Sequence, residues 1–141
     1  MAVFERGGLR FLYPENWQVE EASADDGWSV TVQSPQTAFL MISVHEDRPD
    51  VQDVLDTTLA ALREDYPDLE AQAVSERIGT RKARGHDIQF FSMDLTNTCW
   101  VRSFRTPERT VLILSQANDL ELEEAEPVLK AIRLSIELTG D

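Results

Sequence analysis

The chain contains one cysteine and two histidines among its 141 residues, and it has no long apolar run. Cys99 alone cannot form an internal disulfide, which fits a reducing compartment. The longest apolar run, from Val111 to Leu114, is far shorter than the roughly 20 residues of a membrane-spanning helix. The first residues also lack the basic start and apolar stretch of a secretory signal. We therefore expect a soluble, cytoplasmic protein.

Basic side chains are scarce, because 13 lysines and arginines face 26 acidic residues and leave a net charge of −13. This balance disfavours nucleic-acid binding and docking on anionic membranes, since both require a basic surface. The charge is unevenly spread, and residues 77–109 hold seven basic side chains against three acidic ones. Two interpretations remain open, namely charge balancing within the fold or a surface with separate acidic and basic regions.

The sequence shows no internal repeat and no linker rich in proline, glycine or serine, so we expect one domain over residues 1–141. Alternating apolar and polar residues predict strands over 17–20 and 28–33. Apolar segments bounded by turn residues predict further strands over 9–12, 38–45, 87–95, 98–105 and 110–116. The segment 38–45 is more continuously apolar and is predicted to be a central strand buried on both faces. Residues 69–78 alternate loosely, and residues 79–85 are predicted to form a polar connection.

Two amphipathic helices are expected. The first follows Asp50, a residue suited to capping a helix N-terminus, and it ends at Tyr66-Pro67. The second covers roughly residues 122–138, although Pro127 leaves its start uncertain. The order of strands, helix, strands and helix predicts an α+β fold in which helices pack on an antiparallel sheet.

Two short segments have motif-like patterns. The segment Phe11-Leu12-Tyr13-Pro14-Glu15-Asn16-Trp17 reads apolar-x-aromatic-Pro-x-x-Trp, and Leu129, Ile132 and Ser135 form a Leu-x-x-Ile-x-x-Ser ending. Both patterns resemble those of the PsbP-like and Mog-like proteins. The resemblance implies an α/β/α sandwich around an antiparallel sheet. It also implies binding without covalent chemistry, because members include a photosystem subunit, a nuclear-import factor, periplasmic lipoproteins and secretion chaperones. No binding residue of the family matches by motif.

Candidate catalytic residues are few. His45 ends a predicted strand and His86 follows a predicted turn, so both are expected at polar boundaries rather than in a catalytic or metal site. Cys99 is expected to be a small buried side chain rather than a reactive thiolate. Asp50 and Asp53 are explained as residues of a helix start. We therefore predict no enzyme activity, no cofactor and no metal site.

The favoured hypothesis is a protein-binding or chaperone-like accessory domain with an unidentified protein partner. Trp28 is most simply a core or sheet-face residue. In the alternative interpretation, Trp28 beside Asp25 and Asp26 lies exposed at a rim, where aromatic side chains anchor protein interfaces. A second set of partner-binding candidates comes from the basic segment and comprises Arg81, Lys82 and Arg84.

Two alternatives remain open. One is a small-ligand-binding domain, or an enzyme of unfamiliar type, with a pocket between sheet and helix lined by Tyr13, Trp17 and Arg102. The other is a structural subunit of a homo-oligomer, since exposed strand edges can pair. The chain is expected to be a monomer or a weak homodimer.

Overall fold

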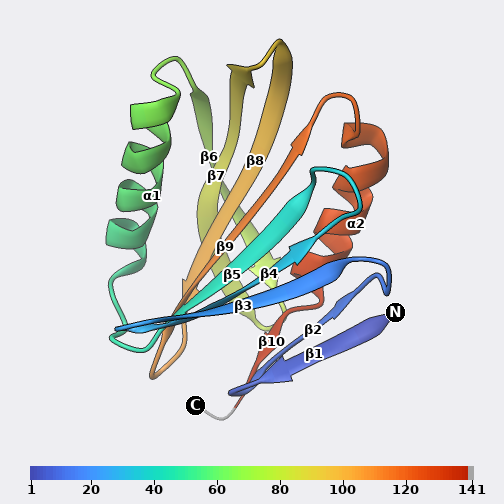
Figure 1. Ribbon diagram of the computed structural model, residues 1–141. Coiled ribbons are helices and arrows are strands. Elements are labelled where there is room, and N and C mark those ends of the chain that lie inside the picture. Colours follow the sequence, from blue (N-terminus) through green and yellow to red (C-terminus); the bar gives the residue numbers. More distant parts are fainter. Residues whose placement is uncertain (140–141) are drawn as a thin grey trace.

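The computed structural model describes residues 1–139, which form ten strands and two α-helices (Figure 1). The elements in chain order are β1 (Ala2–Arg6), β2 (Leu9–Tyr13), β3 (Gln18–Ala24), β4 (Gly27–Gln33), β5 (Phe39–His45), α1 (Val51–Asp65), β6 (Glu70–Ile78), β7 (Arg81–Ser92), β8 (Leu95–Arg105), β9 (Thr110–Asn118), α2 (Leu122–Leu134) and β10 (Glu137–Leu138). Neither helix is long and apolar enough to cross a bilayer.

Seven strands form one sheet in the order β3-β4-β5-β9-β8-β7-β6, and every neighbouring pair is antiparallel. A smaller sheet has the order β1-β2-β10. The two ends of the described chain meet in this small sheet, because β10 pairs with β2. The predicted α+β class and antiparallel sheet are confirmed.

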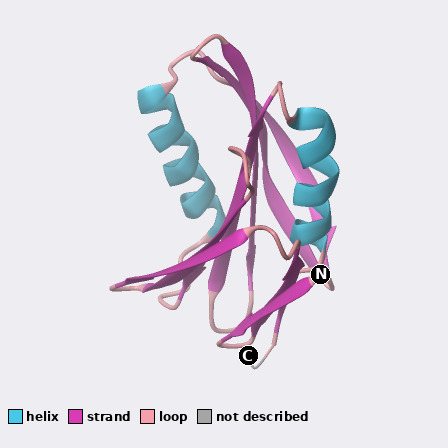
Figure 2. Cartoon of the chain, turned by 45° about the vertical axis from the view of Figure 1, so that its right-hand side comes forward, coloured by secondary structure: helices cyan, strands magenta, loops and turns pink. Residues whose placement is uncertain are grey.

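The two helices lie on opposite faces of the large sheet (Figure 2). Neighbouring residues of β8 show the alternation: Val101 packs in the apolar cluster beneath α1, whereas Trp100 packs in the larger cluster that contains α2 and the small sheet. Successive side chains of a strand point to opposite faces, so each strand supplies both cores. The result is the α/β/α layering that the resemblance implied.

The first helix matches its sequence signals. The Asp50 carboxylate accepts a hydrogen bond from the Gln52 N–H at 2.8 Å, which satisfies a helix-start amide that has no partner within the helix. The second helix is shorter than predicted and stops at Leu134. The backbone of Glu137 and Leu138 pairs with β2 instead of continuing the helix, because an open strand offers the same hydrogen bonds as another helical turn.

Three predictions of local structure are wrong. Residues 79–85 are not a loop, since only Gly79 and Thr80 turn and β7 begins at Arg81. Ala83 and Gly85 face the core there, and charged residues lie between them. The inward-facing residues are small, so the segment was interpreted as polar and its alternation was missed. Strand β1 was not predicted at all. Finally, β5 is buried on one face only, because α1 lies over β8 and leaves the other face of β5 partly open.

Candidate functional site

Three large apolar side chains are exposed at one end of the molecule. Phe91 is 69% exposed, Met93 92% and Leu120 81%. We call these three residues the apolar tip. Isolated exposed apolar residues are ordinary, but a group of them at one place marks a contact surface.

The sheet pairing brings the members of the tip together. Phe91 and Met93 belong to the hairpin between β7 and β8, and Phe91 pairs with Thr96 across it. The carbonyl of Thr96 accepts a hydrogen bond from the Asp119 N–H at 2.9 Å, which places Leu120 beside the hairpin. This end of the sheet is the upper end in Figure 1. The carboxylates of Asp94 and Asp119 are exposed next to the tip residues.

The hairpin turn holds an unfavourable backbone conformation. Met93 has a φ of 53° and Asp94 a φ of 63°, so both central residues of this two-residue turn are left-handed. Asn-Gly is the usual sequence for such a turn, and a methionine there costs on the order of 1 kcal/mol. Sparsely populated backbone conformations concentrate at functional positions.

A groove of about 490 Å³ lies on the α2 side of the sheet, and its walls include Gln89 and Leu122, each two residues along the chain from a tip residue. Phe91, Gln89 and Asp87 alternate along β7, so all three face this side. We call this hollow the acidic groove, and its walls are Glu70, Ala71, Gln72, Asp87, Ile88, Gln89, Thr98, Trp100, Leu122 and Glu126. Three carboxylates and one indole therefore line a hollow that opens beside the exposed tip.

A network of ion pairs includes Asp87, one of the residues that line the groove. Arg102 lies 2.9 Å from the Asp87 carboxylate and 3.2 Å from that of Glu76. Arg133 of α2 donates two hydrogen bonds to Glu76, at 2.6 and 3.1 Å. Burial raises the pKa of Glu76, but the hydrogen bond and charge of Arg133, together with the charge of Arg102, outweigh it and hold that pKa below 4.5. The network fixes Asp87 and the second half of β6, through Glu76, relative to α2.

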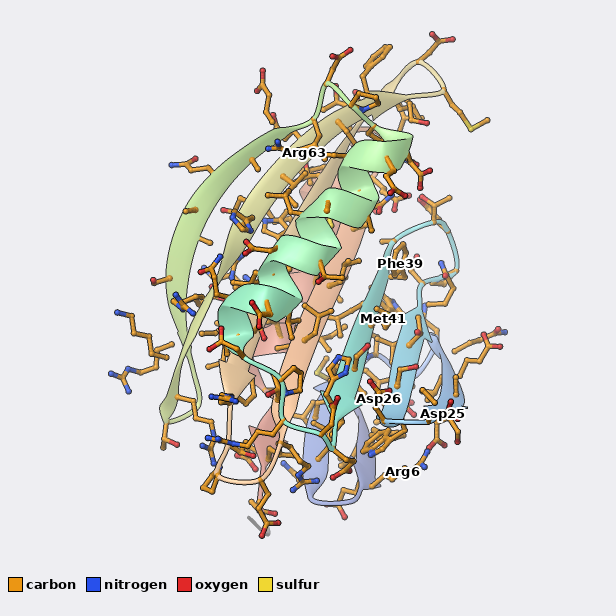
Figure 3. The ribbon with its side chains drawn as sticks, turned by 90° about the vertical axis from the view of Figure 1, so that its left-hand side faces the viewer. Arg6, Asp25, Asp26, Phe39, Met41 and Arg63 are labelled. Carbon is orange, nitrogen blue, oxygen red and sulfur yellow. The ribbon has the colours of Figure 1, made fainter. Side chains whose placement is uncertain are left out.

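Trp28 lies in the core, in agreement with its simpler interpretation, and the alternative of an exposed rim is wrong. It is 9% exposed and packs against Phe4, with the Arg6 guanidinium 4.4 Å from its ring centroid. Strand β1, which the sequence analysis missed, supplies both of these neighbours. Asp25 and Asp26 are exposed in the turn between β3 and β4, as Figure 3 shows, far along the chain from the apolar tip. Their predicted role in binding stays a prediction.

The basic segment does not form one surface. Arg105 donates to the carbonyls of Arg48 and Pro49, and Arg109 to those of Gly7 and Thr139, so both tie loops together. Arg102 belongs to the buried network. The partner-binding candidates Arg81, Lys82 and Arg84 lie on β7, where Arg84 donates to the Gln52 side chain at 3.3 Å.

The predicted pocket of Tyr13, Trp17 and Arg102 is also not formed. Trp17 lines a hollow of about 250 Å³ beside Pro35 and Val128, but neither Tyr13 nor Arg102 contributes to it. Arg102 lies on β8 with 4% of its surface exposed and is held by acidic partners. The sequence signal was ambiguous, because an arginine in the middle of a strand can form an ion pair within the sheet instead of contacting a ligand.

Among residues 1–139, one group has the geometry to hold a metal ion. Ligand atoms of Asp26, His45 and Asp47 lie within 4.8 Å of one another. Both carboxylates are exposed, and the side chain of His45 is 26% exposed. Cys99 is buried, and its desolvation raises the pKa of the thiol to about 12. This thiol is therefore not a nucleophile at neutral pH, as the sequence predicted.

The α1 side of the sheet is covered only in part. Figure 3 shows Phe39 and Met41 on β5 beside α1. Both are half-buried, while the alternate residues Leu40 and Ile42 are fully buried on the opposite face. This open area is less exposed than the apolar tip.

No protein-family model matches the sequence, and no curated protein matches it either. Solved structures do. The solution structure of cyanobacterial PsbP from Synechocystis sp. PCC 6803 has a TM-score of 0.70 at 10% identity, covering 98% of this chain and 92% of that one. A mutant of the protein Mog1 has a TM-score of 0.61 at 12% identity, covering 98% and 96%. A Pseudomonas aeruginosa protein of unknown function, PA94, described as a putative regulator, has a TM-score of 0.59 at 14% identity, covering 100% and 99%.

These matches extend over nearly the full length of both chains, so they compare whole folds rather than a shared fragment. At identities of 10% to 14%, the similarity shows a shared fold, and function has to be argued from the site. The two patterns of the sequence resemblance also meet in space: the Leu12 N–H donates to the Ser135 hydroxyl at 2.9 Å. By structure, the chain has the PsbP/Mog-like fold.

Proposed function

We propose that this chain is a non-enzymatic accessory domain that binds another protein, and that the apolar tip is its main contact. The single observation that carries the proposal is the exposure of Phe91, Met93 and Leu120 at one end of the sheet. Aromatic and methionine side chains are enriched at protein interfaces. Burying such residues in a partner removes apolar area from water, which is the main driving force of association.

The surroundings of the tip support a protein rather than a membrane as the partner. Asp94 and Asp119 lie next to the apolar side chains, and anionic lipid surfaces repel carboxylates. The acidic groove beside the tip adds polar contacts around an apolar centre, which is the usual composition of a protein interface. The fold supports the proposal only in a general way, because one fold hosts many functions.

Affinity capture with matched variants tests this function. The tagged protein is compared with the double variant Phe91→Ser, Leu120→Ser in an extract of its native cells. The control is the double variant Val3→Ser, Leu134→Ser, which removes apolar side chains that are 47% and 42% exposed elsewhere on the surface. Quantitative mass spectrometry measures the captured proteins, and thermal unfolding confirms that each variant folds.

We expect a reproducible partner whose recovery falls at least roughly tenfold with the tip variant, since central interface residues carry most of the binding free energy. The control variant should recover as much partner as the unaltered chain. Equal loss with both variants, equal recovery with both, or no reproducible partner at all would overturn the proposal.

A further inference from the structure

The outer edge of β6 is an unpaired strand edge. β6 is the last strand of the large sheet and pairs only with β7. Its nine residues run without a bulge, from Glu70 opposite Gln89 to Ile78 opposite Arg81. Natural proteins protect such edges with proline, lysine, bulges, short strands or inward-pointing charges. β6 has an inward-pointing charge at Glu76, near its C-terminal end, and none of the other devices.

The opposite edge strand, β3, is also largely exposed, but it contacts the small sheet. On β3, Glu21 accepts a hydrogen bond from Arg6 of the small sheet at 2.8 Å. The small sheet therefore reaches over part of this edge. On β6 the four residues 70–73 are likewise all exposed.

Hollows flank β6 on both faces of the sheet. On the α2 side lies the acidic groove, which Glu70 and Gln72 line from β6. On the α1 side lies a hollow of about 320 Å³, which Ala73 and Ser75 line from the same strand. Successive residues of a strand added beside β6 would point alternately toward these two hollows. Strand addition with side-chain pockets at alternate positions is a recurrent mode of peptide recognition.

We propose that the edge of β6 binds an extended segment of the partner as an additional antiparallel or parallel strand, with lysine or arginine side chains at alternate positions reaching the acidic groove. This inference rests on the proposed function, because it names the kind of segment that a protein-binding domain would take.

The charges of the groove define the chemistry of the segment. Asp87 is already paired with Arg102. Glu70 and Glu126 are exposed, and within residues 1–139 neither carboxylate takes part in a hydrogen bond or an ion pair. Two unpaired carboxylates beside the Trp100 indole suit a cationic side chain, which gains both charge pairing and aromatic contact. An acidic segment would be repelled at the same place.

The test uses a fluorescent seven-residue peptide in which lysine and valine alternate, titrated with the purified protein and followed by fluorescence anisotropy. A peptide with glutamate in place of lysine is the charge control. The double variant Glu70→Gln, Glu126→Gln is compared with Glu20→Gln, Glu108→Gln. The second pair removes the same charge from exposed positions outside the groove.

We expect the lysine peptide to bind and the glutamate peptide not to bind. The groove variant should weaken binding by about tenfold, as expected for the loss of two partly exposed charge pairs, and the control variant should change it little. Equal weakening by both variants would mean a general attraction to an acidic protein and would overturn the proposal.

Backbone methylation tests strand addition directly. Two further peptides carry N-methyl groups on alternate residues, in opposite phase. In an added strand only alternate amides face the neighbouring strand, so one phase should abolish binding and the other should preserve it. Equal effects of both phases would contradict a β-strand mode.

Failure of this inference is distinguishable from failure of the proposed function. If no peptide binds while capture still depends on the apolar tip, the partner does not use the β6 edge, and only the inference fails. If sedimentation shows a dimer of the chain that the lysine peptide does not dissociate, a second copy occupies the edge, and the inference is again overturned.

Discussion

Arg133 of α2 donates two hydrogen bonds to the Glu76 carboxylate of β6, at 2.6 and 3.1 Å, and so joins the last helix to the edge strand of the sheet. Both side chains are largely buried, at 5% and 21% exposure. Arg102 of β8 adds a third bond to the same carboxylate. The position of β6 relative to α2, and with it the shape of the acidic groove, depends on this network.

The substitution Glu76→Gln should destabilise the fold by about 2 kcal/mol, because it removes the negative partner of the buried Arg133 guanidinium and leaves Arg102 with Asp87 alone. Urea unfolding measures the free energy of unfolding. The control Glu20→Gln removes an exposed carboxylate and should change stability by less than about 0.5 kcal/mol. Equal effects would show that the network contributes nothing specific.

The stabilisation by Glu76 should depend on pH. The folded-state pKa of this carboxyl lies below 4.5, while unfolding returns it to that ordinary value. The unfolded chain therefore binds more protons at acidic pH, and stability falls as pH decreases. The difference in unfolding free energy between the unaltered chain and Glu76→Gln should be constant above about pH 5 and shrink below it. A difference that grows on acidification would contradict the assigned ion pairs.

Cys99 should be unreactive in the folded protein. Its thiol is buried, and its pKa is raised to about 12, so almost no thiolate is present at neutral pH. Ellman's reagent should react with Cys99 only as fast as the protein unfolds, and at once in denaturant. Immediate reaction of the folded chain would show that β8 is open to solvent.

Ser135 should stabilise the junction between α2 and the small sheet. Its hydroxyl accepts from the Leu12 N–H and donates to the Ile132 carbonyl at 2.7 Å. The substitution Ser135→Ala should cost about 1 to 2 kcal/mol, because it leaves a partly buried amide unpaired. Hydrogen exchange at the Leu12 amide should accelerate more than the global loss of stability explains. Unchanged exchange there would rule out this bond.

The sequence was most informative where a local signal decides the structure. The Asp50 cap and the periodic apolar residues located α1, and alternation located β4. The sequence was uninformative where a segment distant along the chain determines the structure. β10 forms by pairing with β2, and Trp28 is covered by residues of β1.

The candidate site was missed for a similar reason. Residues 87–95 were taken as one strand, so Met93 was not recognised as part of a turn. Two adjacent aromatic residues, Phe90 and Phe91, were the available signal, since they point to opposite faces and are both buried only where both faces of the sheet are covered. Phe90 stacks on Tyr66 with 3.9 Å between ring centroids, and Phe91 is exposed. The proximity of Leu120 follows from tertiary pairing and has no local signal.

Photo-crosslinking from the apolar tip tests the central claim most directly. The variant Phe91→p-benzoylphenylalanine places a photoreactive group at the tip, and Val3→p-benzoylphenylalanine places the same group on the exposed edge strand β1. After irradiation in native cells, the account predicts one discrete protein adduct from position 91 and none from position 3. Equal labelling from both positions, or no adduct from position 91, would contradict a protein-binding role for this end of the sheet.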